Sequence, residues 1–185
     1  MRAPWLAGLV LLAPVTAGAA TPWKVDVPHS TLTFRATQAG AEFEGSFRLF
    51  TADVAFDAGD LAGSRFDVRI VTASAETKEQ QRDDILKGAD FFATAKYPEA
   101  RYVATKFRRT ATGYAADGAL TLRGITRPVE VAFTLTPGAA GQAKLAGGAS
   151  VKRLDFGVGQ GEWQSTEWVG NDVKIRFELK LSAAR

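Results

Sequence analysis

The sequence of 185 residues contains no cysteine and only one histidine, His29. Without cysteine the chain can form neither a disulfide nor a thiolate metal site. One histidine cannot build the multi-histidine sites that hold zinc, and no spaced acidic loop suggests a carboxylate site for a hard cation. Disulfide scaffolds and the common classes of metalloprotein are therefore excluded.

The chain also lacks a strong surplus of charge of either sign. It has 23 Lys and Arg against 20 Asp and Glu, a net charge of +3. A protein that grips nucleic acid through many phosphates normally shows a larger or more clustered basic surplus. We therefore expect no nucleic-acid partner.

The N-terminal residues are typical of a secretory signal peptide. Arg2 supplies a positive charge, Trp5–Val15 is mostly apolar, and Ala17–Ala20 consists of small residues. The apolar stretch is too short for a good membrane span, although an uncleaved anchor is the alternative. We assign residues 1–20 to a cleaved signal peptide and 21–185 to a single domain.

Most of the remaining chain alternates apolar and polar residues with a period of two, which indicates half-buried strands. The clearest runs are Phe43–Leu49, Phe66–Ile70, Val129–Leu135 and Val173–Leu181. Pro28 is expected to break the first strand, because proline cannot donate to a ladder. Turn signals between the runs give about eight antiparallel strands.

One segment, Thr77–Pro98, contains the only helical pattern. Thr77 followed three residues later by Gln80 fits a capping box, and Gly88 is placed to end the helix. We expect this segment to form a lid or plug between the two halves of the structure. The fold class is therefore all-β with one short helical insertion.

Eight strands with one apolar face each favour a closed antiparallel up-and-down barrel, since closure removes the sheet edges. A two-sheet sandwich is the alternative. An eight-stranded barrel has an interior just wide enough for a small ligand or for packed side chains. The expected inward positions are rich in Gly and Phe, which favours an apolar cavity.

Several short motifs follow one another along the chain. They are Trp23–Asp26 with His29-Ser30, Gly45–Phe47, Arg82–Asp84 with Asp90–Phe92 and Tyr97-Pro98, Gly118–Thr126, Arg153–Gly157 and Gly170–Val173. The set resembles the YceI-like family of secreted bacterial proteins. Ile85 stands where that family often has histidine, so no metal or proton role is expected there.

The resemblance implies an eight-stranded lipocalin-like barrel in the periplasm that holds a polyisoprenoid chain of the isoprenoid quinone or prenyl lipid type. Such a protein would serve transport, storage or stress protection without catalysis, and without a cofactor other than the bound lipid or quinone. Transient contact with a membrane or a membrane redox protein stays open, as does the oligomeric state, a homodimer included.

On this interpretation the inward apolar side chains form the wall of the ligand cavity. The expected wall residues are Phe34, Phe47, Phe66, Phe91, Phe92, Tyr102, Phe107, Phe133 and Phe156. An enzyme acting on a small apolar substrate is one alternative and would need convergent polar groups with shifted pKa values. A fully packed barrel that serves as a stress-response or interaction partner is the other.

Two polar pairs that suggest catalysis have simpler interpretations. His29 and Ser30 are neighbours on a strand and point to opposite faces, so they cannot share a proton. Asp83 and Asp84 point in different directions on a helix. We expect a structural role for them, with Arg82 or Lys78 either pairing with carboxylates or capping loop carbonyls.

The loop Gly157–Gly170 contains four glycines and two tryptophans that carry no clear chemistry. Gly157, Gly159 and Gly161 lack the strand and helix of a phosphate loop. We expect Trp163 and Trp168 to pack within the loop, with a place at the barrel rim or a membrane surface as the alternative.

Overall fold

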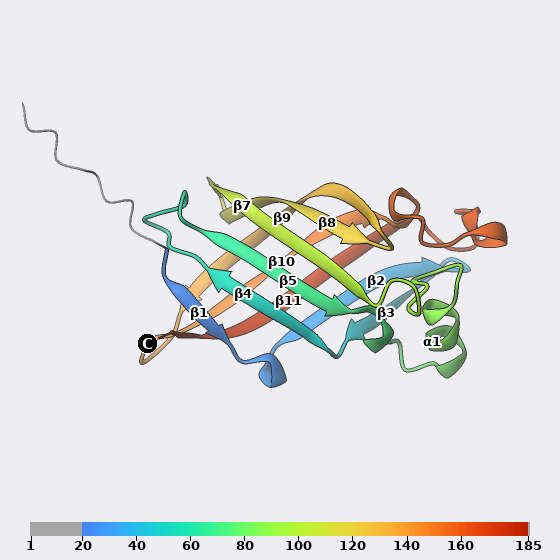
Figure 1. Cartoon of the computed structure of the whole chain (residues 1–185), viewed down its shortest axis with the longest axis horizontal. Coiled ribbons are helices and arrows are strands. Elements are labelled where there is room, and N and C mark those ends of the chain that lie inside the picture. Colours follow the sequence, from blue (N-terminus) through green and yellow to red (C-terminus); the bar gives the residue numbers. More distant parts are fainter. Residues whose placement is uncertain (1–19, 185) are drawn as a thin grey trace, which may run out of the picture.

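A single antiparallel sheet closes into an eight-stranded barrel in the computed structural model, which describes residues 20–184 (Figure 1). The strands are β1 (Pro22–Val25), β2 (Thr31–Gln38), β3 (Ala41–Phe47), β4 (Phe50–Ala55), β5 (Arg65–Val71), β6 (Ala75–Glu76), β7 (Glu99–Thr110), β8 (Gly113–Leu122), β9 (Ile125–Pro137), β10 (Gln142–Lys152) and β11 (Asp172–Ala183). The helix α1 spans Gln80–Lys87, and short 3-10 turns span Val27–His29, Thr72–Ser74, Arg153–Phe156 and Gly161–Gln164. The predicted signal peptide lies outside the described residues except for Ala20.

Interruptions divide the eight barrel strands into eleven segments. β1 pairs with β4 while β2 pairs with β3, so β1–β2 and β3–β4 each act as one bent strand. β5 pairs with β4 and β6 pairs with β3, so β5 and β6 together form the next barrel strand. β11 pairs with β10 on one edge and with both β1 and β2 on the other, which closes the barrel. The predicted barrel is therefore confirmed.

The predicted break at Pro28 is confirmed, and Ser30 repairs the ladder across it. The Ser30 Oγ accepts a hydrogen bond of 3.0 Å from Lys180 N and donates one of 2.7 Å to Asp26 O. The His29 ring instead lies beside the exposed Asp26 carboxylate, with 2.9 Å between Nδ1 and Oδ2. Ser30 thus has a structural use, and His29 contacts the Asp26 carboxylate, whereas Ser30 contacts the Asp26 backbone.

Glycines make room for large rings inside the barrel. The Phe34 ring lies against Gly45, where a Cβ would stand 2.3 Å from the ring. The Tyr102 ring lies against Gly118, where a Cβ would stand 2.5 Å from it. β7 shifts register between Ala104 and Lys106, opposite this glycine, as at a β-bulge.

Aromatic rings fill one end of the barrel. Both ends of the described chain lie at this end of the ribbon (Figure 1). Phe56, almost fully buried, contacts Phe133 edge to face with centroids 5.1 Å apart. Phe66 meets Phe107 in the same way at 4.9 Å, and Tyr114 stacks on Phe133 at 5.6 Å. We call these five residues the aromatic cluster. Because the rings contact one another, this end of the interior is packed.

The helix is where the sequence predicts one, but its cap is different. Glu79, not Thr77, is the N-cap, and its carboxylate accepts hydrogen bonds from Gln81 N at 3.0 Å and Arg82 N at 2.9 Å. A carboxylate at this position also complements the positive end of the helix dipole. The predicted capping box is therefore wrong.

Thr77 is engaged by Asp83, which explains the displaced cap. Both the amide and the hydroxyl of Thr77 donate to Asp83 Oδ1, at 2.7 Å and 2.6 Å. Asp83 is buried by this contact, whereas Asp84 accepts only from Gln80 at the surface. The structural interpretation of Asp83 is confirmed, although its partner is not Arg82 or Lys78. Gly88 ends the helix as predicted.

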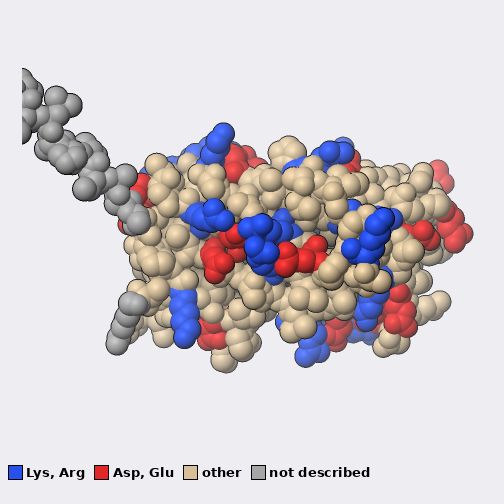
Figure 2. Space-filling view, viewed as in Figure 1, with Lys and Arg blue, Asp and Glu red and all other residues tan. Residues whose placement is uncertain are grey.

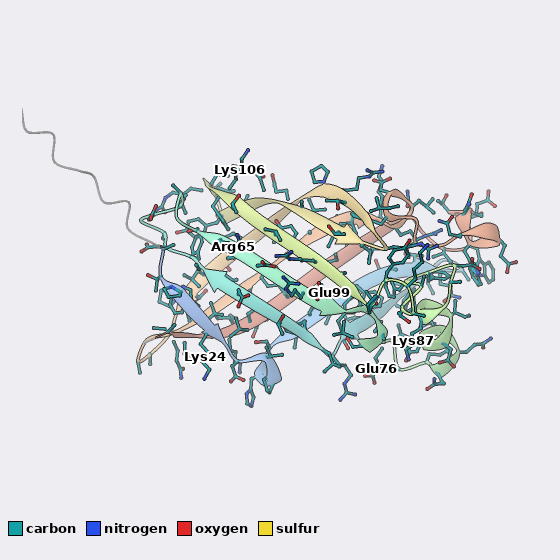
Figure 3. The ribbon with its side chains drawn as sticks, viewed as in Figure 1. Lys24, Arg65, Glu76, Lys87, Glu99 and Lys106 are labelled. Atoms are coloured by element: carbon teal, nitrogen blue, oxygen red, sulfur yellow. The ribbon has the colours of Figure 1, made fainter. Side chains whose placement is uncertain are left out.

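Acidic and basic side chains alternate on the outer face over β5 and β7 (Figures 2 and 3). Arg101 donates two hydrogen bonds to the Asp67 carboxylate at 2.8 and 2.6 Å, and Arg65 donates a third at 2.9 Å. These bonds, Arg101's first, lower the pKa of Asp67 far below its usual range although burial opposes the shift. The pair joins β5 to β7 on the outside of the barrel.

We predict that Ser30→Ala lowers the free energy of unfolding by about 1 kcal/mol, because Lys180 N loses its acceptor. His29→Ala is the matched control and should change it by less than about 0.5 kcal/mol, since the His29 pair is exposed. Urea unfolding followed by circular dichroism measures both. Equal effects of the two substitutions would contradict the role assigned to Ser30.

We predict that Asp67→Asn lowers stability by about 1–2 kcal/mol at pH 7. The folded pKa of Asp67 is depressed, so its contribution is complete above about pH 4 and is lost as the pH falls toward the folded value. In denaturant titrations, the difference in unfolding free energy between wild type and Asp67→Asn should therefore become smaller as the pH falls from 5 to 2.5. Asp117→Asn, which alters an exposed pair, should show no such pH dependence; a constant gap for Asp67→Asn would sink the assignment.

Candidate functional site

The barrel end opposite the aromatic cluster, here called the mouth, is covered by two segments (Figure 1). One is α1 with the turns that follow it to Pro98, and the other is residues 153–170. The amides of Gly159 and Gln160 both donate to Asp90 O, at 2.7 and 2.9 Å, which ties the two segments together. Because β5 pairs directly with β7, the helical segment covers one end of the barrel and does not separate its halves.

Arg153 organises the second of these segments from within. Its guanidinium donates to the carbonyl oxygens of Gly170, Val158, Ser165 and Val169, at 2.8 to 3.2 Å. The side chain is buried, and its acceptors are all carbonyl oxygens, with no carboxylate among its described partners. Burial therefore lowers the pKa of Arg153, and the carbonyl dipoles hold the charge in place.

Beneath the two segments lies an apolar cavity of about 100 Å³, the mouth cavity. Strands β2, β3, β8, β10 and β11 contribute to its wall, and Leu86 of α1 contributes from the mouth side. Phe91 and Phe92, in the turns after α1, are buried against it. The Phe92 ring lies 5.9 Å from that of Phe47, which lies 5.3 Å from Phe34.

A second apolar cavity of about 90 Å³, the central cavity, lies further along the barrel. Leu32 and Phe177 line the central cavity, while Phe34 and Ile175 line the mouth cavity. These four residues belong to the paired strands β2 and β11, where Phe34 lies opposite Ile175 and Leu32 opposite Phe177. The two cavities therefore lie in series along the barrel axis.

The nine predicted wall residues fall into three groups. Phe34, Phe47, Phe91, Phe92 and Phe156 line the mouth cavity. Phe66 and Tyr102 line the central cavity. Phe107 and Phe133 line neither and belong to the aromatic cluster, where mutual ring contacts fill the space.

A groove of about 270 Å³, the outer groove, runs on the surface of the mouth between α1 and the loop Gly157–Gly170, which contains Trp163 and Trp168. Phe43, Leu86, Phe91 and Val169 line both this groove and the mouth cavity, so one wall of side chains separates the two spaces. The groove thus lies directly outside the apolar interior.

Both tryptophans of the loop line the outer groove, so the expectation that they pack only within the loop is wrong. Trp168 is 56% exposed. Trp163 packs edge to face on Phe91 with centroids 5.4 Å apart. The rim position that we considered as the alternative is the one the structure has.

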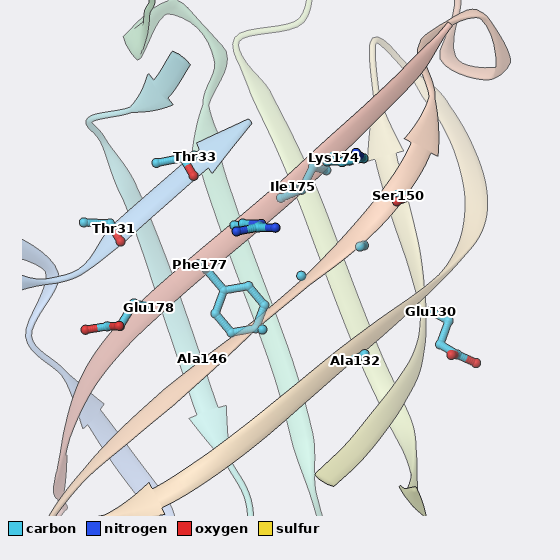
Figure 4. Close-up of a pocket in the computed structure, with 14 residues that line it drawn as sticks. Thr31, Thr33, Glu130, Ala132, Ala146, Ser150, Lys174, Ile175, Phe177 and Glu178 are labelled. Atoms are coloured by element: carbon cyan, nitrogen blue, oxygen red, sulfur yellow. The ribbon is translucent and has the colours of Figure 1, made fainter. Parts of the chain in front are cut away.

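A broader depression of about 790 Å³ lies on the outside of the barrel over β9, β10, β11 and β2 (Figure 4). Small side chains such as Ala132 and Ala146 form its floor, and Lys174, Glu130 and Glu178 lie around it. It faces away from the interior, from which the sheet separates it. The apolar spaces of the molecule are therefore inside and at the mouth.

The polar groups of the two cavities are Tyr102 and Arg153. The Tyr102 hydroxyl lies 3.0 Å from Ala116 O and 3.2 Å from Val129 O, to which it donates. Burial, with smaller effects of nearby carboxylates, raises its pKa well above the ordinary value, so the hydroxyl stays protonated. This set of groups suits an apolar ligand better than proton transfer.

The described residues contain neither a candidate metal site nor a helix that could span a membrane. Within 20–184 no group of three or more metal-binding side chains lies together. No helix in that part of the chain is long and apolar enough to cross a membrane.

We predict that Arg153→Met lowers the free energy of unfolding by about 2–4 kcal/mol, because four carbonyl groups lose a charged donor. Hydrogen exchange should accelerate in residues 157–170 and change little in β7 and β8. Lys152→Met removes an exposed charge next to it and serves as the control. Unchanged exchange in 157–170 would show that Arg153 does not hold this segment.

Comparison with known proteins agrees with this architecture. The YceI-like domain profile matches residues 23–181. A UPF0312 protein of Photorhabdus laumondii is 36% identical over 126 residues, which cover 66% of this chain and 65% of that protein. BcnA of Burkholderia cenocepacia has a crystal structure with a TM-score of 0.80 at 31% identity, covering 85% of this chain and 99% of that one.

A more distant structure shares the fold alone. It is a polyisoprenoid-binding domain from Saccharophagus degradans, with a TM-score of 0.68 at 14% identity, covering 88% of this chain and 98% of that one. The domain profile nevertheless spans almost all of the described residues, from β1 to β11. The chain therefore belongs to the YceI-like domain family.

Proposed function

We propose that this protein is a periplasmic binding protein that holds one polyisoprenoid chain, of the quinone or prenyl lipid type, inside its barrel. The observation that carries the proposal is the apolar mouth cavity, which lies directly beneath an amphipathic groove. The description of the Saccharophagus degradans domain as polyisoprenoid-binding supports it. A role as carrier or store follows from such binding, and no step of catalysis is needed.

The ligand enters through the mouth. The opposite end is filled by the aromatic cluster, whose rings contact one another at centroid distances near 5 Å. At the mouth, by contrast, one layer of side chains separates the cavity from the outer groove. Entry at this end requires those side chains to move and leaves the sheet intact.

Binding also requires the two cavities to join. Each holds about 100 Å³ or less, whereas pockets for small molecules usually hold about 300–1,000 Å³. Each CH₂ group that enters contributes roughly 0.8 kcal/mol before ordering costs. A chain of several isoprene units therefore gains enough to displace rings of the mouth-cavity wall, such as Phe34 and Phe47.

Native mass spectrometry of protein purified from its host envelope tests the proposal, with extraction and identification of the bound lipid. We expect one molecule of prenyl lipid per chain. If the protein carries no lipid and takes up none from isoprenoid-containing vesicles, the alternative of a packed barrel that acts through its surface is favoured.

We predict that the double substitution Phe91→Ala/Phe92→Ala lowers lipid retention several-fold, because both rings close the mouth cavity. Far-ultraviolet circular dichroism should show unchanged strand content. Phe107→Ala is the matched control: it removes a ring from the packed end and should leave retention unaltered. Equal loss of lipid in both variants would mean that retention follows general stability and not the mouth.

A further inference from the structure

Arg82 stands in the outer groove without an acidic partner among the described residues. Its Nε donates a 3.0 Å hydrogen bond to the Gln38 side-chain oxygen. Its guanidinium carbon lies 4.4 Å from the centre of the Phe43 ring, which fixes the planar group over the groove floor. The other guanidinium N–H groups of Arg82 have no hydrogen-bond acceptor within residues 20–184, so they are free to bind a ligand.

The groove carries almost no net charge. Its ionisable side chains are Arg82 and Glu79, and its other polar side chains are the neutral Gln38 and Gln81. Glu79 cannot turn away from the groove without cost, because both of its oxygens cap α1. A phosphate or diphosphate would therefore meet one cation and one fixed anion, where such groups normally require clusters of basic residues.

The opposite wall of the groove is apolar. Trp163 and Trp168 face α1 across it, and Trp163 is held in place by its contact with Phe91. A headgroup in the groove would thus have indole rings on one side and the donors of Arg82 on the other. This combination fits an uncharged group that carries oxygen acceptors.

The groove also lies where a bound chain would end. Phe43, Leu86, Phe91 and Val169 separate it from the mouth cavity, so a chain passing between these side chains emerges beside Arg82. We propose that the outer groove is a headgroup site, in which Arg82 donates to a carbonyl or hydroxyl oxygen of an uncharged isoprenoid amphiphile. This inference rests on the proposed function and adds to it a choice between uncharged and phosphorylated headgroups.

Three isoprenoid ligands that present different groups to the groove test the inference. Geranylgeraniol has an uncharged headgroup, geranylgeranyl diphosphate has an anionic one, and squalene is an isoprenoid hydrocarbon with no headgroup. Each is delivered from the same detergent to the full-length mature protein, and the dissociation constant is measured by native mass spectrometry or by tryptophan fluorescence. Wild type should bind geranylgeraniol more tightly than the diphosphate.

Arg82→Met keeps an apolar stem over Phe43 and removes the donors. It should weaken geranylgeraniol binding about ten-fold, the size of one hydrogen bond to a charged group, and leave squalene binding unchanged. Lys87→Met removes a charge from the same helix away from the groove, and should bind all three ligands as wild type does (Figure 3).

The outcomes separate the two proposals. If both proteins bind squalene, and if wild type and Arg82→Met bind geranylgeraniol with equal affinity, the headgroup site is overturned. The proposed function then still stands. Tighter binding of the diphosphate than of the alcohol also overturns the headgroup site. If wild type binds none of the three, the proposed function itself fails.

Discussion

The closure of the sheet through β11 is the constraint on which the rest of the structure depends. Because β11 is bonded to β10 along its length and to β1 and β2 on the other edge, every inward side chain must fit into one enclosed space. Rings fit there only where the neighbouring strand yields room, as at Gly45 and Gly118. Closure also requires the bent first strand, whose missing ladder bonds Ser30 restores.

The two ends of the barrel are closed by different physical means. Aromatic contacts seal one end, and these have no substitute in water. At the mouth, hydrogen bonds to Arg153 and to the Asp90 carbonyl hold the covering segments, and water can replace such bonds when they open. Opening therefore costs less at the mouth, although Arg153 keeps residues 157–170 in one arrangement while the apolar side chains below move.

Much of the barrel could be predicted from the alternation of apolar and polar residues, because this alternation indicates which face of each strand is buried. The pattern does not state how deep along the barrel a residue lies, so it could not separate Phe107 and Phe133 in the packed end from Phe34 in the mouth cavity. Arg82 and Arg153 stand in motifs of the sequence, but the sequence does not indicate that Arg82 lies in a groove or that Arg153 holds a loop, since an arginine beside charged neighbours is usually solvated. Their environments arise from contacts between distant segments.

The separation of apolar interior and amphipathic groove has a consequence for selectivity. In the complex that we propose, the interior recognises a chain by the apolar area that it buries, which does not depend on the group at the end of the chain. The groove acts only on that end, through one cation whose field is offset by Glu79. In the complex that we propose, the cavity wall provides the affinity that every isoprenoid chain shares. Arg82 adds to that affinity only when the headgroup carries an oxygen acceptor, so substitutions at Arg82 alter the headgroup preference.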